Sequence, residues 1–147
     1  MATMGFQLYD GDAQVVTGLE SSGTQTFVSG ELVIISGGYI AIATTSSDLY
    51  GVALTKASGT AATKIQVIPL RPEQRWLAQA TGTTALTNQG VAYDCDFTAG
   101  AMGVNPSGTT VGAFFVEALD PRDGAHTGAG GRVIGRFVYA SCDAVGG

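Results

Sequence analysis

The sequence predicts an all-β protein: a compact β-sandwich, or a β-tulip or barrel-like domain, with an extended N-terminal arm and little helix. Segments rich in Val, Ile, Thr, Phe and Tyr are separated by turn-forming residues about every eight to twelve positions. Residues 31–43 place two such segments on either side of Ser36-Gly37-Gly38, which is typical of a tight hairpin. No long stretch has the apolar period of a helix, and a single turn at 85–88 is the exception.

The first 26 residues differ in pattern from the rest of the chain. They contain no long apolar run and are interrupted at Asp10-Gly11 and between Gly18 and Gly23. We predict an N-terminal arm or outlying hairpin for residues 1–26 and a β domain for residues 27–147, because chain termini are the segments least often tied to a domain.

Apolar side chains in this first segment have two interpretations. They could form an arm that adds a strand to the sheet edge of a partner protein, or an ordinary first strand of the domain. On the arm interpretation, deleting the residues before Gly23 leaves a folded domain that no longer binds its partner. The side chains concerned are those of Met4, Phe6, Leu8 and Tyr9.

Further strands are predicted along the domain. Residues 75–80 are compatible with a helix or a strand, and we predict a strand because the Gly and Thr residues at 81–84 would leave a helix too short to be stable. The other predicted strands cover 50–54, 63–68, 91–97, 103–105, 111–119 and 132–141, with a glycine-rich loop at 120–131.

Charge and hydropathy exclude several classes of partner. The net charge is −5 and the seven Lys and Arg residues are scattered, which disfavours nucleic-acid binding because that depends on clustered cations. No apolar run approaches the roughly eighteen residues of a membrane-spanning helix. The N-terminus lacks the pattern of a secretory signal. We therefore expect a soluble protein, made in a cytoplasm, whose partner is another protein.

Residues capable of chemistry are few. The single histidine, His126, lies in a glycine-rich segment, and no Gly-x-Ser-x-Gly motif accompanies it. Cys95 and Cys142 are expected as small buried residues, and a disulfide between them is the alternative. We predict no catalytic residue, no metal, no cofactor and no enzymatic activity.

Two pairs of carboxylates could suggest a cation site. Asp94 and Asp96 would point to the same face of a strand, and Asp10 and Asp12 flank a glycine. Neither pair continues into the ligand-rich loop that calcium requires, so solvated carboxylates and a turn are the expected roles.

Low charge and aromatic side chains favour a protein that binds through its surface. Charged residues make up 13% of the chain, and protein interfaces favour depleted charge and aromatic anchors. Most aromatic residues are expected in the core, and Trp76 is the candidate anchor of the domain body.

Several segments together resemble the capsid decoration, or cement, proteins of tailed bacteriophages. The resemblance extends over nearly the whole chain from Phe27 and rests on structural patterns without catalytic signatures. It is carried by Phe27–Val33, Ser36–Tyr39, Asp48–Leu54, Gly90–Asp94, Val104–Ser107, Phe115–Asp120 and Arg132–Phe137.

This resemblance implies a virion structural protein on the outer surface of the capsid, made in the host bacterial cytoplasm. It implies binding to the major capsid protein, stabilisation of contacts between capsid subunits, and self-association, expected as a trimer. The alternatives are a tail, baseplate or head-fibre adaptor of a phage, or a carbohydrate-binding module in which Trp76 lines a sugar platform.

Overall fold

The structure is a computed structural model that describes residues 5–11, 14–20, 25–44, 48–54, 57–59, 64–98, 101–120 and 128–138. These residues form antiparallel strands joined by turns, and the 3-10 helix η1 (Leu86–Asn88) is the one helical segment among them. The predicted all-β class is therefore confirmed. His126, Cys142, Met4 and Asp12 lie outside the described residues.

Two five-stranded antiparallel sheets form the body of the protein. Sheet A has the order β1 (Phe6–Asp10), β9 (Arg75–Gln79), β16 (Arg132–Phe137), β14 (Phe114–Leu119) and β11 (Val91–Tyr93). Sheet B has the order β2 (Val16–Glu20), β8 (Lys64–Pro69), β6 (Gly51–Ala53), β4 (Leu32–Ser36) and β5 (Tyr39–Ile42).

Two-stranded ribbons complete the described part of the fold. One pairs β3 (Gln25–Phe27) with β7 (Ala57–Gly59) beside sheet B. The others pair β10 (Thr83–Thr84) with β15 (Gly128–Ala129), and β12 (Cys95–Asp96) with β13 (Gly103–Val104).

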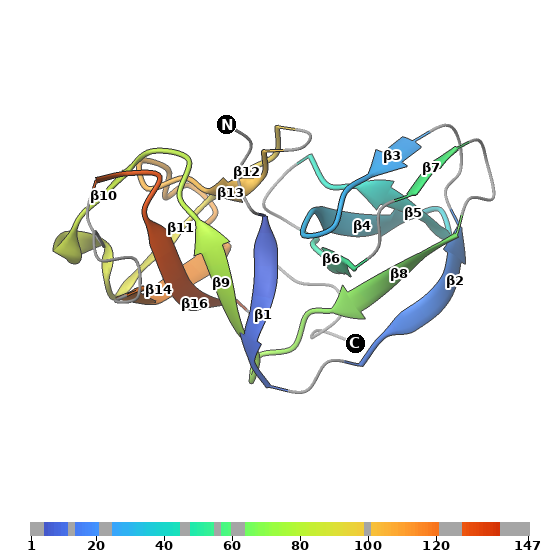
Figure 1. Cartoon of the computed structure of the whole chain (residues 1–147), viewed down its shortest axis with the longest axis horizontal. Helices are drawn as coiled ribbons and strands as arrows, with labels where there is room; N and C mark the ends of the chain where they lie inside the picture. The colour runs from blue at the N-terminus through green and yellow to red at the C-terminus, as the bar shows by residue number, and fades with distance from the viewer. Residues whose placement is uncertain are drawn as a thin grey trace.

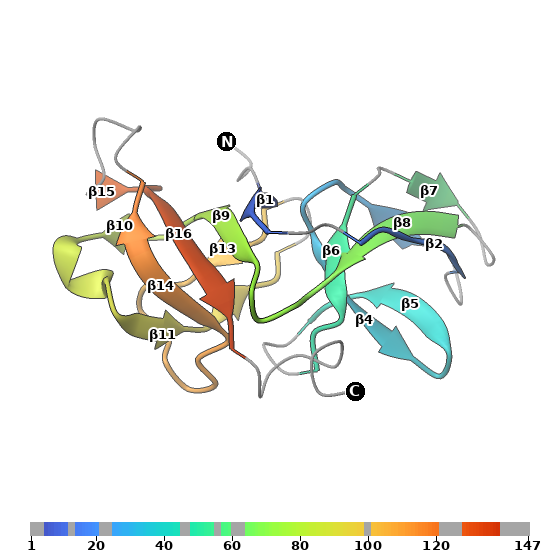
Figure 2. The same ribbon diagram turned by 90° about the horizontal axis from the view of Figure 1, so that it is seen from below.

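The two sheets lie side by side along the long axis of the molecule (Figure 1), and β1 stands at the edge of sheet A that faces sheet B. Sheet B is curled, because its two edge strands β2 and β5 approach each other. The same arrangement is visible from below (Figure 2). The described strands thus combine an open sheet with a curled half-barrel.

One hydrophobic core joins the two sheets. Its centre is a group of aromatic rings from sheet A, with centroid distances of 5.1 Å between Phe114 and Phe137 and 6.0 Å between Trp76 and Phe137. Phe6 from β1 packs on Phe137 at 5.3 Å. Sheet B contributes Leu32, Val52 and Ile68 to this main core, so one face of each sheet packs into it.

A second core lies on the other face of sheet B. Side chains alternate along its strands: Leu32 and Val52 face the main core, whereas the neighbouring Val33 and Ala53 face the second core. Such alternation follows from the two-residue period of a strand. The second core consists of Phe27, Val33, Ile40, Ala53, Ile65 and Val67.

The predicted hairpin at residues 31–43 is confirmed. β4 and β5 pair from Val33 opposite Ile42 to Ser36 opposite Tyr39. Gly37 and Gly38 form the turn with φ angles of +59° and +85°. Two consecutive positive φ angles match the two-residue turns that fit the twist of a hairpin, and glycine adopts them without steric cost.

The predicted strands at 75–80 and 103–105 are present as β9 and β13, and the single turn at 85–88 is η1. The prediction for 91–97 was wrong as one continuous strand, because it divides at Asp94 into β11 and β12. The Asp94 N–H donates to Gly108 O at 2.7 Å, which turns the chain away from sheet A. The strand expected at 111–119 begins only at Phe114.

The N-terminal segment belongs to both sheets. β1 pairs with β9 and β2 pairs with β8, so the described residues before 27 are not an extended arm separate from the domain. The Phe6 N–H also donates to Gly30 O at 2.8 Å. This agrees with the second of the two interpretations of the segment, an ordinary first strand of the domain. The sequence left the choice open because a short edge strand has little sequence signal.

Candidate interaction surfaces

The N-terminal residues predicted to contact a partner differ in their exposure to solvent. Phe6 is 2% exposed and belongs to the main core, and Leu8 packs against the same core. Tyr9 is 46% exposed. The burial of Phe6 agrees with the second interpretation of this segment, an ordinary first strand, and Tyr9 alone of these three presents a large surface to solvent.

The prediction of Trp76 as a surface anchor was wrong for this fold. Trp76 is 1% exposed, because it points from β9 into the main core and packs against Phe137. A ring at this place offers no platform for a sugar, so the carbohydrate-binding alternative loses the residue on which it depended.

The carboxylates of Asp94 and Asp96 have separate roles. Asp94 Oδ1 accepts N–H groups of Val111 and Gly112, each at 2.8 Å, and Asp94 Oδ2 accepts the Thr110 N–H at 3.2 Å. Asp96 Oδ2 instead accepts the hydroxyl of Thr81. Asp94 therefore fixes the loop before β14, which sequence spacing could not show because its partners lie sixteen to eighteen residues away.

Within the described ranges, no group of three His, Cys, Asp or Glu side chains is arranged to hold a metal ion. Cys95 is buried. None of the described segments forms a helix long and apolar enough to cross a bilayer.

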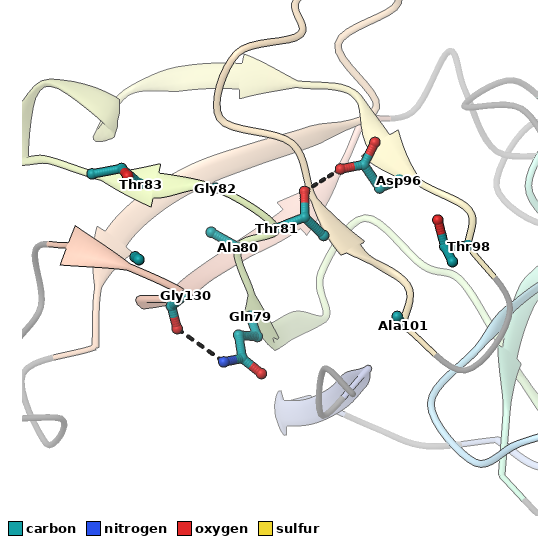
Figure 3. Close-up of a pocket in the computed structure, with 10 residues that line it drawn as sticks. Gln79, Ala80, Thr81, Gly82, Thr83, Asp96, Thr98, Ala101 and Gly130 are labelled. Carbon is teal, nitrogen blue, oxygen red and sulfur yellow. Dashed lines mark hydrogen bonds between the residues drawn. The ribbon is translucent and has the colours of Figure 1, made fainter. Parts of the chain in front are cut away.

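A hollow lined by both polar and apolar groups lies at the end of sheet A, between the two ribbons that follow β9 and β11 (Figure 3). Its volume is about 410 Å³. Gln79 Nε2 donates to Gly130 O at 3.0 Å on one side, and the Thr81–Asp96 pair lies on the other (Figure 3). Its lining residues are Gln79, Ala80, Thr81, Gly82, Thr83, Asp96, Thr98, Ala101, Ala129 and Gly130.

This hollow can offer hydroxyl, amide and carboxylate groups to a small polar ligand. Its lining includes one carboxylate, that of Asp96, and no His, Lys, Arg or Cys. A nucleophile paired with a base would need such neighbours, so the described lining supports hydrogen bonding without an evident reaction.

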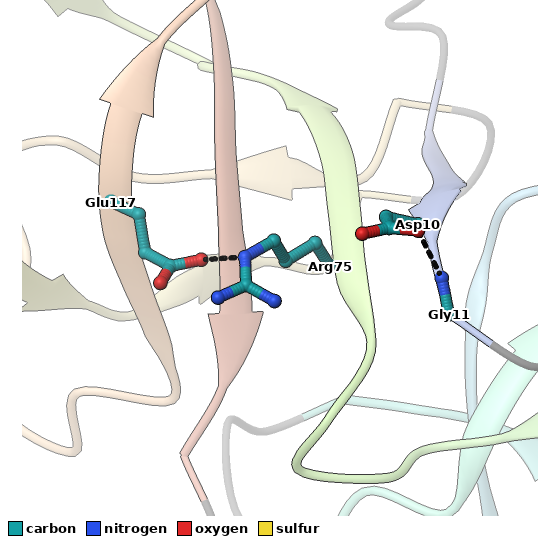
Figure 4. Close-up of polar contacts among 4 residues, drawn as sticks. All are labelled: Asp10, Gly11, Arg75 and Glu117. Atoms are coloured by element: carbon teal, nitrogen blue, oxygen red, sulfur yellow. Dashed lines mark hydrogen bonds and ion pairs between the residues drawn. The ribbon is translucent and has the colours of Figure 1, made fainter.

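The outer face of sheet A, opposite the main core, carries charged and aromatic side chains. Arg75 Nε lies 3.1 Å from Glu117 Oε1, and this pair spans from β9 across β16 to β14 (Figure 4). Arg136 on β16 lies over the ring of Phe115 on β14, with 4.9 Å from the guanidinium carbon to the ring centroid. This face could not be predicted from the sequence, since residues 75, 115, 117 and 136 become neighbours only through strand pairing.

Large apolar side chains are exposed at both ends of the long axis. Leu86 in η1 is 58% exposed, and η1 lies at the end of the molecule farthest from sheet B (Figures 1 and 2). At the other end, the β4–β5 hairpin exposes Ile35 and Tyr39 at 37% and 46%. Other exposed apolar residues are Tyr9, Val15, Val28, Leu54 and Val111.

Comparison with known proteins adds no relative: no protein-family model matches the chain, and no curated protein matches it.

Proposed function

We propose that this protein is a virion structural protein of a tailed bacteriophage, a decoration protein that binds the outer capsid surface and bridges major capsid protein subunits. The all-β fold, the low charge and the sequence resemblance support the proposal. The observation that carries it is the exposure of Leu86 at one end of the molecule and of Ile35 and Tyr39 at the other.

A protein that bridges two neighbours needs a contact surface on each side. Burying one exposed side chain such as Leu86 or Tyr39 stabilises a contact by only about 1.5–3 kcal/mol, which is too little to hold a particle alone. Once the first surface has docked, the second acts at high effective concentration, so weak contacts combine into tight attachment. The main core joins the two sheets, which keeps the two ends at a fixed separation.

Binding of the purified protein to expanded, undecorated capsids tests the proposal. We expect saturable attachment that electron microscopy locates at a regular lattice position on the shell. Attachment to tails or baseplates, with bare capsid faces, would instead support the adaptor alternative. Binding to neither particle would contradict the proposal.

Two single variants and their combination test the bridging mechanism. We expect Leu86→Ser and Tyr39→Ser each to weaken capsid binding about tenfold, and the double variant to reduce it to background, because each removes one of two linked contacts. Val15→Ser is the matched control, since Val15 is similarly exposed (43%) but lies in the connection between β1 and β2. Equal losses in all three single variants would contradict two-ended bridging.

A further inference from the structure

Arg136 is held in a fixed orientation without an opposing carboxylate. Arg136 and Phe115 are direct partners in the pairing of β16 with β14, and the guanidinium lies over the ring at 4.9 Å. In the part of the chain that the structure describes, Arg136 forms no ion pair. Arg136 is partly buried as a residue, and the Phe115 ring restricts the plane of its guanidinium.

The charges around Arg136 come from both neighbouring strands. Gly135 pairs with Trp76, so the next positions, Arg136 and Arg75, stand side by side on the outer face. Arg75 contacts Glu117. Asp10 is the register partner of Arg75 on β1, and its Oδ1 accepts the Gly11 N–H at 2.9 Å (Figure 4). The face therefore carries two arginines and two carboxylates, and Arg136 is the arginine that has a ring contact and no carboxylate contact among the described residues.

We propose that the Arg136–Phe115 pair is a docking site for a carboxylate side chain on a partner protein. The planar guanidinium matches the two oxygens of a carboxylate, and stacking on a ring lowers the entropy lost when this bond forms. Arginine and aromatic residues are also the side chains that dominate binding energy at protein interfaces. A nucleic acid is disfavoured as partner because its binding depends on clustered cations, and the seven Lys and Arg residues are scattered along the chain.

This inference deepens the proposed function, on which it rests for the identity of the partner: an acidic segment of a capsid subunit. Its chemistry can be tested without capsids. The probe is a synthetic octapeptide of alternating Glu and Thr, because alternate residues of an extended chain present their carboxylates on one face. The analogue with Gln in place of Glu is the neutral control.

Binding of this peptide to the full-length protein is followed by NMR of the arginine Nε–Hε signals. We expect the signal of Arg136 to shift, and Arg136→Gln to weaken binding about tenfold. Arg136→Lys and Phe115→Leu should each weaken it several-fold, because they remove the planar fork and the stacking ring. Lys64→Gln on sheet B removes the same charge elsewhere and should bind as the unaltered protein does.

Equal binding by Arg136→Gln and Lys64→Gln would overturn the inference. So would equal binding of the Gln analogue, or a DNA oligonucleotide that binds through Arg136 more tightly than the peptide. Circular dichroism of each variant confirms that loss of binding does not reflect unfolding.

Capsid binding by the same variants separates this inference from the proposed function. If the unaltered protein binds capsids and the Arg136→Gln variant binds them equally well, the proposed function stands and the docking site is overturned. If the peptide binds in a way that depends on Arg136 but the protein does not bind capsids, the docking site is upheld and the proposed function is contradicted.

Discussion

Sheets A and B differ in how many of their faces are buried. Sheet A buries one face with large rings and leaves the other face to Arg75, Glu117 and Arg136. Sheet B buries both faces with smaller side chains, since its curl and the β3–β7 ribbon enclose the second core. A sheet with one polar face is available for binding, whereas a sheet buried on both faces offers only its edges and turns. This explains why the two proposed contact types differ: a charged face on sheet A and a hairpin tip on sheet B.

Deletion of the N-terminal strands is the change expected to have the largest effect, and it tests how far the two sheets depend on each other for stability. Deleting residues 1–22 removes β1 from sheet A and β2 from sheet B, and takes Phe6 from its contacts with Phe114 and Phe137. We expect the truncated chain to lose cooperative unfolding, because the deletion opens an edge of each sheet and the main core together. Thermal unfolding followed by circular dichroism measures this. A truncated protein that unfolds cooperatively near the original temperature would restore the arm interpretation.

Substitutions in the two cores should have effects of different extent. Trp76→Ala should lower the free energy of unfolding by about 3–5 kcal/mol and Ile40→Ala by about 2–5 kcal/mol. Hydrogen exchange should show lost protection in both sheets for Trp76→Ala, since the main core joins them, but mainly in sheet B and the β3–β7 ribbon for Ile40→Ala.

Trp76→Phe is the matched control for the first change. The indole N–H of Trp76 has no acceptor among the described residues, so phenylalanine removes no hydrogen bond and retains an aromatic ring. Its cost should be well below that of alanine. If Ile40→Ala removed protection from sheet A as strongly as from sheet B, the division into two cores would be incorrect.

The smallest of these effects is expected at Asp94, which lies between β11 of sheet A and β12 of the ribbon that follows it. Asp94→Asn replaces a carboxylate that accepts three backbone N–H groups, and an amide retains one accepting oxygen. We expect a loss of about 1–3 kcal/mol in the free energy of unfolding, measured by urea denaturation. Asp48→Asn is the control, because Asp48 is exposed and lies outside this loop. Equal costs for both changes would show that the loop does not depend on Asp94.

Much of the fold could be predicted because strands and tight turns have local signals. The run at 32–35 and the glycines at 37 and 38 identified the β4–β5 hairpin, and the breaker residues at 81–84 identified β9 as a strand. The division at Asp94 could not be predicted, since it depends on hydrogen bonds to residues 108–112.

The candidate surfaces were harder to predict than the fold. Trp76 was chosen for its type, and its burial depends on the packing of β9 against β16 and β1. The Arg136–Phe115 pair was missed, because these residues are twenty-one positions apart and meet only through the register of β14 with β16.

The sequence by itself determined the all-β class, the hairpin and the low charge of the protein, because turn chemistry, two-residue periodicity and composition act over a few residues. Only the tertiary structure decided which sheet each strand joins, that Phe6 and Trp76 lie in the core, and that Arg136 lies on Phe115. Those outcomes depend on pairing between distant segments, and a shift of one residue in register would reverse which side chains face solvent.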